Sequence, residues 1–188
     1  MKRTFLLAAM SIACLTTTGS SQPLLEKPTT RHWKAILADR VPAFGHRNWI
    51  VIADSAYPAQ TRTGIETIVT NADQLTVLKT VFSELAKAKH IRPVILLDAE
   101  LPVVSEKDAN GIGKYRDDLT KLLGDRKPQS LPHEQIIAKL DKTGETFRVL
   151  VLKTDLTLPY TSVFLELDCG YWSPEAEQRL RDAIKSSR

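Results

Sequence analysis

The chain has 188 residues, 43% of them hydrophobic, with 26 Lys and Arg against 22 Asp and Glu and a formal net charge of +4. This length and balance predict one globular domain with a single core, and exclude collagen-like, low-complexity and disordered chains. Lys2 and Arg3 supply half of the excess charge, and no basic block alternates with aromatic residues. We therefore expect no nucleic-acid partner, because such proteins need a concentrated basic surface.

The first 21 residues have the pattern of a secretory signal peptide. Lys2 and Arg3 precede a mostly apolar run over residues 4–15, and small polar residues follow up to Ser21. The run is about a dozen residues, shorter than the ~20 that span a bilayer as a helix. We therefore expect an exported protein, periplasmic or extracellular.

The two cysteines predict no internal disulfide framework. Cys14 follows Ser-Ile-Ala, which loosely resembles a bacterial lipoprotein box and leaves lipidation at Cys14 open. Cys169 lies in an apolar, strand-like run, where we expect it to be buried and inert. Membrane association is expected only if Cys14 carries a lipid.

After the signal peptide, residues 22–30 form a polar lead-in and residues 31–188 a single domain in which strands and helices alternate. Apolar residues at helical spacing predict helices near 30–37, 71–85, 112–123, 130–140 and after Ser173 and Pro174. Continuous apolar runs predict strands at 49–53, 93–97, 147–152 and 163–167. This alternation favours an α/β fold with a mostly parallel central sheet flanked by helices, in which ligands bind at the carboxyl ends of strands.

Motifs for cofactor and metal chemistry are missing from the sequence. The first strand-to-helix turn lacks the Gly-x-Gly-x-x-Gly of dinucleotide folds, and no Gly-Lys-Ser/Thr phosphate loop occurs. The histidines and cysteines form no His-x-x-x-His or Cys-x-x-Cys pair, so a zinc site is not expected. No Gly-x-Ser-x-Gly elbow indicates a serine hydrolase. We expect a protein without cofactor or metal.

Three short patches carry the functional signal. In the first, Gly45-His46 precedes the strand at 49–53, Asp54 ends that strand, and Pro58 follows four residues later. The second is Pro-His-Glu-Gln, with His133 at the start of a helix, and the third is Pro-Tyr-Thr-Ser over residues 159–162. In this order and spacing, the patches resemble the D-ribose pyranase and L-fucose mutarotase family, over roughly residues 36–170.

The resemblance implies a Rossmann-like α/β sandwich that assembles into homo-oligomers, pentameric rings or decamers, with sites near subunit interfaces. It also implies a cofactor-free isomerase that interconverts the pyranose and furanose forms, or the anomers, of a free monosaccharide. One position departs from the family pattern, because Ser162 stands where the family has Asn. This change leaves the sugar and the activity open.

The chemistry suggests a role for each of these residues. Opening a cyclic hemiacetal needs one acid and one base, and His46 suits both roles because histidine exchanges protons near neutral pH. Asp54, His133, Tyr160 and Ser162 are predicted to bind the sugar, and His133 is also a candidate second proton carrier. His46 and Asp54 are eight residues apart, roughly 26 Å in an extended strand at ~3.3 Å per residue. Direct contact would therefore need a loop that folds back, or a neighbouring subunit.

Two other functions stay open. The first is a non-catalytic, exported carbohydrate-binding protein that keeps the pocket, which the Ser162 change favours. The second is an α/β interaction domain without a sugar site. The sugar itself is not determined by the sequence.

Overall fold

The computed structural model describes residues 30–187. The predicted signal peptide, Cys14 and the lead-in up to residue 29 lie outside the described residues. Within the described part, no helix is long and apolar enough to cross a bilayer.

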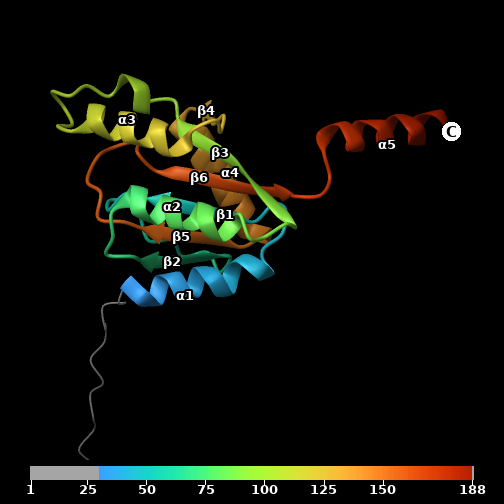
Figure 1. Ribbon diagram of the computed structural model, residues 1–188, viewed down its shortest axis with the longest axis horizontal. Helices are drawn as coiled ribbons and strands as arrows, with labels where there is room; N and C mark the ends of the chain where they lie inside the picture. Colours follow the sequence, from blue (N-terminus) through green and yellow to red (C-terminus); the bar gives the residue numbers. More distant parts are fainter. Residues whose placement is uncertain (1–29, 188) are drawn as a thin grey trace, which may run out of the picture.

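Helices and strands alternate through the domain (Figure 1). The helices are α1 (Thr30–Arg40), α2 (Gln74–Leu85), α3 (Ile112–Leu123), α4 (His133–Thr146) and α5 (Pro174–Ser186), with short 3-10 turns at Val41–Ala43 and Leu101–Val103. The strands are β1 (Trp49–Ala53), β2 (Ile65–Val69), β3 (Ile91–Asp98), β4 (Gln129–Leu131), β5 (Val149–Lys153) and β6 (Val163–Cys169). They form one sheet in the order β2-β5-β1-β6-β3-β4. The predicted α/β class is confirmed.

Strand β6 runs antiparallel to both of its neighbours, β1 and β3, while the other pairs in the described sheet are parallel. Residues 154–162 connect β5 to β6 without a helix. A parallel return needs a crossover of about a dozen residues or more, so this short connection reverses the chain. The sheet is mostly parallel, as predicted, with one reversed strand near its centre.

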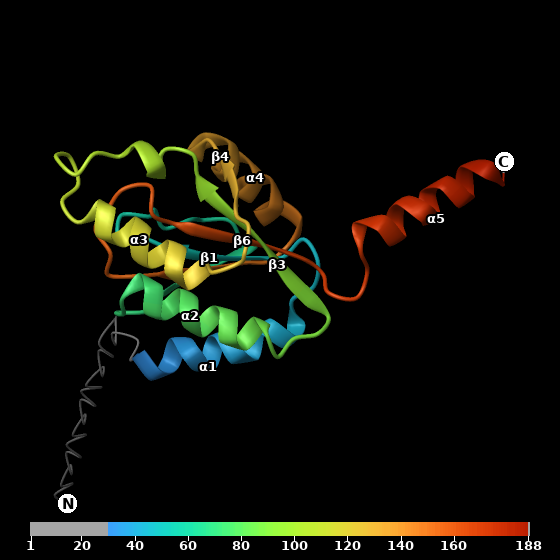
Figure 2. The ribbon, with the colours of Figure 1, turned by 45° about the horizontal axis from the view of Figure 1, so that its top comes forward.

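Each face of the sheet has its own core, because successive strand residues point to opposite sides. Ile50 and Ile52 of β1 pack on the face covered by α1, α2 and α3, whereas Trp49 and Val51 pack on the face covered by α4. Figure 2 shows these three helices together on one side of the sheet and α4 on the other. Both faces of β1 are therefore buried, as its continuous apolar run predicts.

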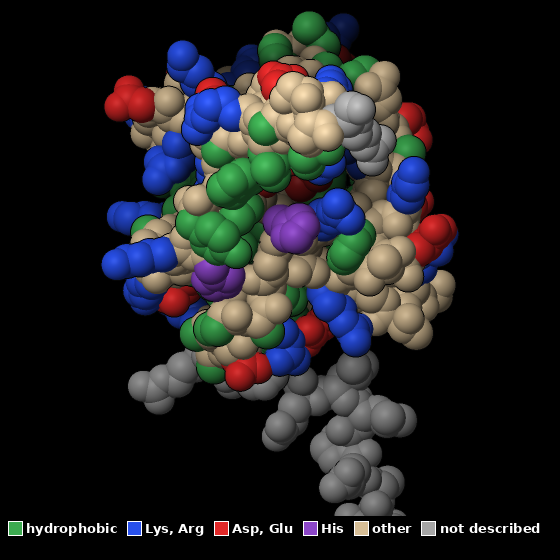
Figure 3. Space-filling model, turned by 90° about the vertical axis from the view of Figure 1, so that its right-hand side faces the viewer, with side chains coloured by type: hydrophobic (Ala, Val, Ile, Leu, Met, Phe, Trp, Pro, Cys, Tyr) green, Lys and Arg blue, Asp and Glu red, His purple; other side chains and the backbone are tan. Residues whose placement is uncertain are grey.

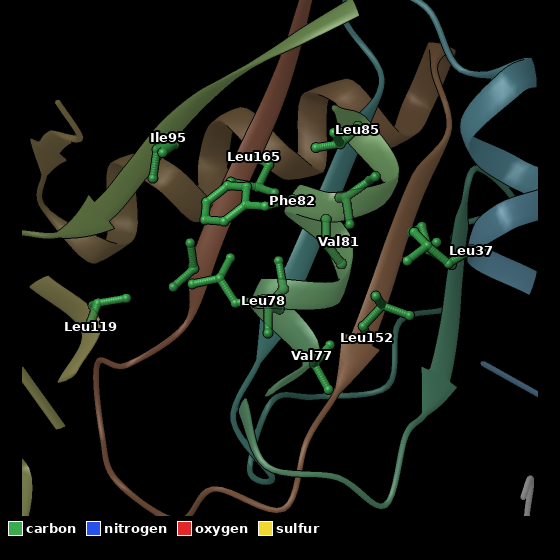
Figure 4. Close-up of a cluster of buried hydrophobic side chains, with 14 of the residues drawn as sticks. Leu37, Val77, Leu78, Val81, Phe82, Leu85, Ile95, Leu119, Leu152 and Leu165 are labelled. Atoms are coloured by element: carbon green, nitrogen blue, oxygen red, sulfur yellow. The ribbon is translucent and has the colours of Figure 1, made fainter. Parts of the chain in front are cut away.

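Helix α2 supplies the centre of the larger core (Figure 4). Val77, Leu78, Val81, Phe82 and Leu85 recur at the spacing of one helix face and point toward the sheet. The N-cap of α2 is Asp73, whose side chain accepts the Thr76 N–H at 2.9 Å. The helix therefore starts a few residues later than predicted.

Two strands and several boundaries differ from the sequence prediction, among them the end of α4, which continues to Thr146 rather than ending at residue 140. β2 lies at the edge of the sheet and is only partly buried, and β4 has three residues. Neither strand has the continuous apolar run by which buried strands are recognised. The helix predicted over 130–140 begins at His133, after Pro132, because a residue before proline disfavours the helical conformation.

Helix α5 stands apart from the domain. Its N-cap Ser173 accepts the Ala176 N–H at 3.1 Å and Pro174 opens the helix, as predicted. None of its residues is buried, and Figures 1 and 2 show it projecting from the end of the body where β6 finishes. The folded body is therefore built by residues that precede α5.

Candidate functional site

The strand register places polar residues in one row at one end of the sheet. Val163, the first residue of β6, pairs with Ile52 of β1 and with Leu97 of β3. One step further along come Ser162 before β6, Asp98 at the end of β3 and Ala53 at the end of β1, which Asp54 follows. His133 and Tyr160 lie close by, as the contacts below show. We refer to Asp54, Asp98, His133, Tyr160 and Ser162 as the polar cluster.

Asp54 and Ser162 contact each other directly. The Ser162 hydroxyl donates to Asp54 Oδ2 at 3.0 Å and accepts the Asp54 N–H at 3.3 Å. Asp54 Oδ1 accepts the Ala56 N–H at 2.8 Å, which holds the turn after β1. Ser162 is buried, and its single proton is used by Asp54. The Asp54 carboxylate is therefore oriented on both oxygens before any ligand binds.

His133 is held at three points. Its backbone N–H lies 3.1 Å from each carboxylate oxygen of Glu100, and its ring Nδ1 lies 3.1 Å from Asp98 Oδ1. Its ring meets the edge of the Tyr160 ring, with 5.6 Å between centroids and an interplanar angle of 85°. The side chain is 31% exposed. The imidazole is therefore fixed in orientation while part of it reaches solvent.

Asp98 and Glu100 are site residues that the sequence analysis did not identify. The Asp98 carboxylate is fully buried, and its Oδ2 has no hydrogen-bond partner among the residues that the structure describes. Burial raises the pKa of Asp98, and the charge and hydrogen bond of His133 offset only part of this rise. Asp98 follows the predicted strand at 93–97, the position where ligands bind in such sheets. That signal was present in the sequence.

A buried hydrogen-bond network holds the segment that carries Tyr160 and Ser162. The Thr161 carbonyl accepts from Gln74 Nε2 at 2.5 Å and from the Tyr115 hydroxyl at 2.8 Å. Burial raises the pKa of Tyr115, so its hydroxyl stays protonated and can donate. Tyr160 has a left-handed backbone, with φ of 56°, which an aromatic residue rarely adopts. Helices α2 and α3 thus fix a strained turn beside the polar cluster.

His46 lies at the opposite end of β1. The turn that carries it is bonded to β6: the Arg47 N–H donates to the Leu167 carbonyl at 2.8 Å, and the Leu167 N–H donates to the Asn48 carbonyl at 2.9 Å. The loop therefore does not fold back over β1. The length of β1, roughly 16 Å at ~3.3 Å per residue, separates His46 from Asp54. Within one chain, the structure brings together four of the five predicted site residues and leaves His46 apart.

His46 lines a hollow between the end of β6 and the base of α5. Figure 3 faces the end of the molecule from which α5 projects, where histidine, basic and hydrophobic side chains are exposed side by side. Arg92 Nη2 lies 2.6 Å from Asp168 Oδ2, and both side chains are about two-fifths exposed. Cys169 also lines this hollow and is half-buried, less than predicted. Polar groups at this end contact solvent as well as one another.

Across residues 30–187, no three His, Cys, Asp or Glu side chains gather in a way that could hold a metal ion. The polar cluster itself offers organic acid and base groups. Its described groups are a fixed carboxylate, an imidazole bonded to a second carboxylate, and a phenol.

No family model matches the sequence, and no curated protein matches it. Among solved structures, the chain is similar to Bacillus subtilis RbsD complexed with D-ribose, at 21% identity and a TM-score of 0.47, covering 71% of this chain and 92% of that one. It is similar to the fucose mutarotase from Streptococcus pneumoniae in complex with L-fucose, at 19% identity and a TM-score of 0.45, covering 69% and 89%. A third, FucU from Bifidobacterium longum, has 14% identity and a TM-score of 0.46, covering 71% and 94%. The chain is therefore similar to solved structures from the family that its three sequence patches resemble.

Proposed function

We propose that the protein interconverts ring forms of a free monosaccharide, pyranose with furanose or one anomer with the other. The observation that carries this proposal is the polar cluster. Asp54, His133 and Tyr160 come from three separate sequence patches, and each contributes to one end of one sheet. The bond from Ser162 to Asp54 and the ring contact from His133 to Tyr160 link the patches in space.

The reaction needs only proton transfers. A base removes the proton of the anomeric hydroxyl while an acid protonates the ring oxygen, so that the bond between the anomeric carbon and the ring oxygen breaks and a carbonyl forms. Rotation and reclosure with the reverse transfers give the other anomer, or the other ring size if a different hydroxyl attacks. General acid/base catalysis of this kind contributes about 10²- to 10⁴-fold. Asp54 would accept hydrogen bonds from sugar hydroxyls, and the Tyr160 ring would contact the C–H face of the sugar.

His46 enters this proposal from a second copy of the chain. It is exposed and lies beyond the amino end of β1, where no residue of the polar cluster can meet it within one chain. In a homo-oligomer with head-to-tail interfaces, the end that carries His46 can face the polar cluster of a neighbour. Each site would then take residues from two copies, in the pentamer or decamer that the resemblance implies.

Exchange between anomer signals in saturation-transfer NMR tests the activity. The sugar panel includes D-ribose and L-fucose, the ligands of two solved structures described above. We expect exchange with the native protein and none with His46→Ala, while Lys107→Ala, an exposed loop variant, should retain it. Full exchange in His46→Ala would remove His46 from the mechanism.

Mixing two inactive variants tests the shared site. His46→Ala and Asp54→Ala are expected to be inactive alone, whereas co-refolded mixtures should regain activity at about one quarter of the sites, if copies assemble at random. Light scattering measures the assembly in parallel. A monomeric protein with full activity would contradict the second-copy arrangement.

A non-catalytic sugar-binding protein is the second candidate. The observation in its favour is Ser162, whose one proton is already donated to Asp54. Saturation transfer from protein to sugar without exchange between anomers would select this function. If no sugar in the panel shows saturation transfer or anomer exchange, the remaining function is an interaction domain.

The proposal also includes export, through the signal peptide predicted for residues 1–21. Mass spectrometry of the protein purified from its native cell fractions would give the mature N-terminus. Cleavage before Cys14 with added lipid mass would establish a membrane-anchored form. Cleavage near residue 21 would establish a free exported form, and an intact Met1 would contradict export.

A further inference from the structure

The buried Asp98 carboxylate is the polar group least explained by packing. Its side chain is 0% exposed, Oδ1 lies 3.1 Å from His133 Nδ1, and Oδ2 has no partner among the described residues. A buried carboxylate normally has several N–H donors or a Lys or Arg partner, because loss of its hydration otherwise destabilises the folded protein. Among the ion pairs that the described residues form, the one partner of Asp98 is His133.

The groups around Asp98 make its charge less favourable. Burial raises its pKa, and the nearby charges of Glu100 and Asp54 raise it further. A hydrophobic residue at the end of β3 would avoid these penalties. Among the residues that the structure describes, the group that the Asp98 carboxylate contacts is the imidazole of His133.

This contact selects one tautomer of the imidazole. A carboxylate oxygen can only accept, so an ionised Asp98 requires the proton of neutral His133 to be on Nδ1. The other ring nitrogen, Nε2, then carries the free lone pair on the side of the ring away from Asp98.

The rest of the surroundings keep this ring in place. Both oxygens of Glu100 accept the His133 N–H at 3.1 Å, which fixes the start of α4. Tyr160 packs edge-on against the ring. The His133 side chain is about one third exposed, so part of the imidazole reaches solvent.

We propose that Asp98 is a positioning residue that holds His133 in the Nδ1-protonated form, and that His133 Nε2 is a second proton-transfer atom of the site. This inference rests on the proposed function and deepens it. When Nε2 takes the proton of the anomeric hydroxyl, the imidazolium formed keeps its Nδ1–H bonded to the Asp98 carboxylate. The acid that protonates the ring oxygen is then His46 of a second copy, and the two histidines exchange roles on reclosure.

The tautomer can be measured without any sugar. In protein labelled with ¹⁵N-histidine, long-range ¹H–¹⁵N correlation spectra distinguish Nδ1–H from Nε2–H rings, and His133→Gln assigns the signal. We expect His133 as Nδ1–H in the native protein at neutral pH. An Nε2–H ring would overturn the proposal, since Asp98 would then not accept from the imidazole.

Asp98→Asn, a variant of similar size, tests the positioning role. Its amide can donate to Nδ1 through N–H₂ or accept from it through the carbonyl oxygen, so we expect His133 to become a mixture of Nδ1–H and Nε2–H forms. The matched control is Asp168→Asn, which removes a carboxylate at the opposite end of the sheet and should leave the His133 ring unchanged. An unchanged ring in Asp98→Asn would contradict the inference.

Turnover separates this role from a purely structural one. Asp98→Asn should lower kcat about 10- to 100-fold, with little change in KM. A loss of this size follows removal of the group that orients a metal-bound histidine. An unchanged kcat with an altered tautomer would refute the role of His133 Nε2. Absence of exchange in the native protein would refute the proposed function instead, while the tautomer result would still decide what Asp98 does.

Discussion

The two ends of the central sheet differ in how far their polar side chains are exposed to solvent. At the carboxyl end of β1 and β3, Asp98 and Ser162 are buried and bonded to other polar residues. At the other end, Arg92 and Asp168 form an ion pair that is open to solvent. Burial of polar groups opposes folding unless each is bonded. The first end therefore holds its polar side chains in a more fixed arrangement than the second.

The largest stability difference expected from a single substitution comes from the buried network beneath Tyr160. In Gln74→Leu, the Thr161 carbonyl and the Tyr115 hydroxyl oxygen each lose the hydrogen bond that they accept from Gln74 Nε2, in a buried region. We expect the free energy of unfolding to fall by about 1–3 kcal/mol. Arg92→Leu at the other end is the matched control, and should change it by less than about 1 kcal/mol. Urea denaturation of both variants measures the contrast, and equal losses would contradict it.

A smaller effect should appear in the pH dependence of stability, with opposite signs at the two ends. For Asp98, the folded pKa is above the unfolded value, so its contribution is present at low pH and is lost as pH rises through the folded pKa. For Asp168, burial raises the pKa, but the Arg92 hydrogen bonds, the Cys169 N–H and nearby positive charge together lower it. Its contribution is therefore present above the unfolded pKa and is lost as pH falls.

Denaturation of two Asn variants from about pH 3 to pH 7 measures these slopes. Relative to the native protein, Asp98→Asn should become more stable as pH rises, because it lacks the carboxylate that ionises unfavourably. Asp168→Asn should be less stable at neutral pH and approach the native protein as pH falls. The second effect is the smaller one, since solvent screens the exposed pair. Slopes of the same sign would show that the two carboxylates have similar surroundings.

Sequence patterns predicted the helices, strands and caps that depend on neighbouring residues. The apolar run of β1, the end of α3 at Gly124 and the Ser173 cap of α5 are all decided by neighbouring residues. The edge strand β2 was missed because its burial depends on β5, which comes more than 80 residues later. A short, half-buried run has no signal of its own.

The candidate site shows the same limit. The motif resemblance identified Asp54, His133, Tyr160 and Ser162, which the structure brings together. It did not identify Asp98, because the role of that residue depends on its contact with His133, which lies 35 residues further along the chain. The spacing of His46 and Asp54 predicted that the two would be far apart, yet no pattern in one chain can show which surface of another copy faces them.

The smallest effect on stability is expected from removing α5. The helix buries no residue of its own, so its deletion removes almost no contact from either core. A chain that ends at Gly170 keeps the N–H bond from Gly170 to the His90 carbonyl, which closes β6 against β3. Its free energy of unfolding should lie within about 0.5 kcal/mol of the native value.

A chain that ends at Glu166 is the matched control for this truncation. It loses Leu167, which is buried in the larger core and pairs with Pro93 of β3, and it also loses the bonds that hold the His46 turn. We expect this shorter chain to be strongly destabilised in urea denaturation. A large loss of stability in the chain that ends at Gly170 would show that α5 packs against the body in solution. The end of the sheet that carries His46 would then be less open to solvent than described above.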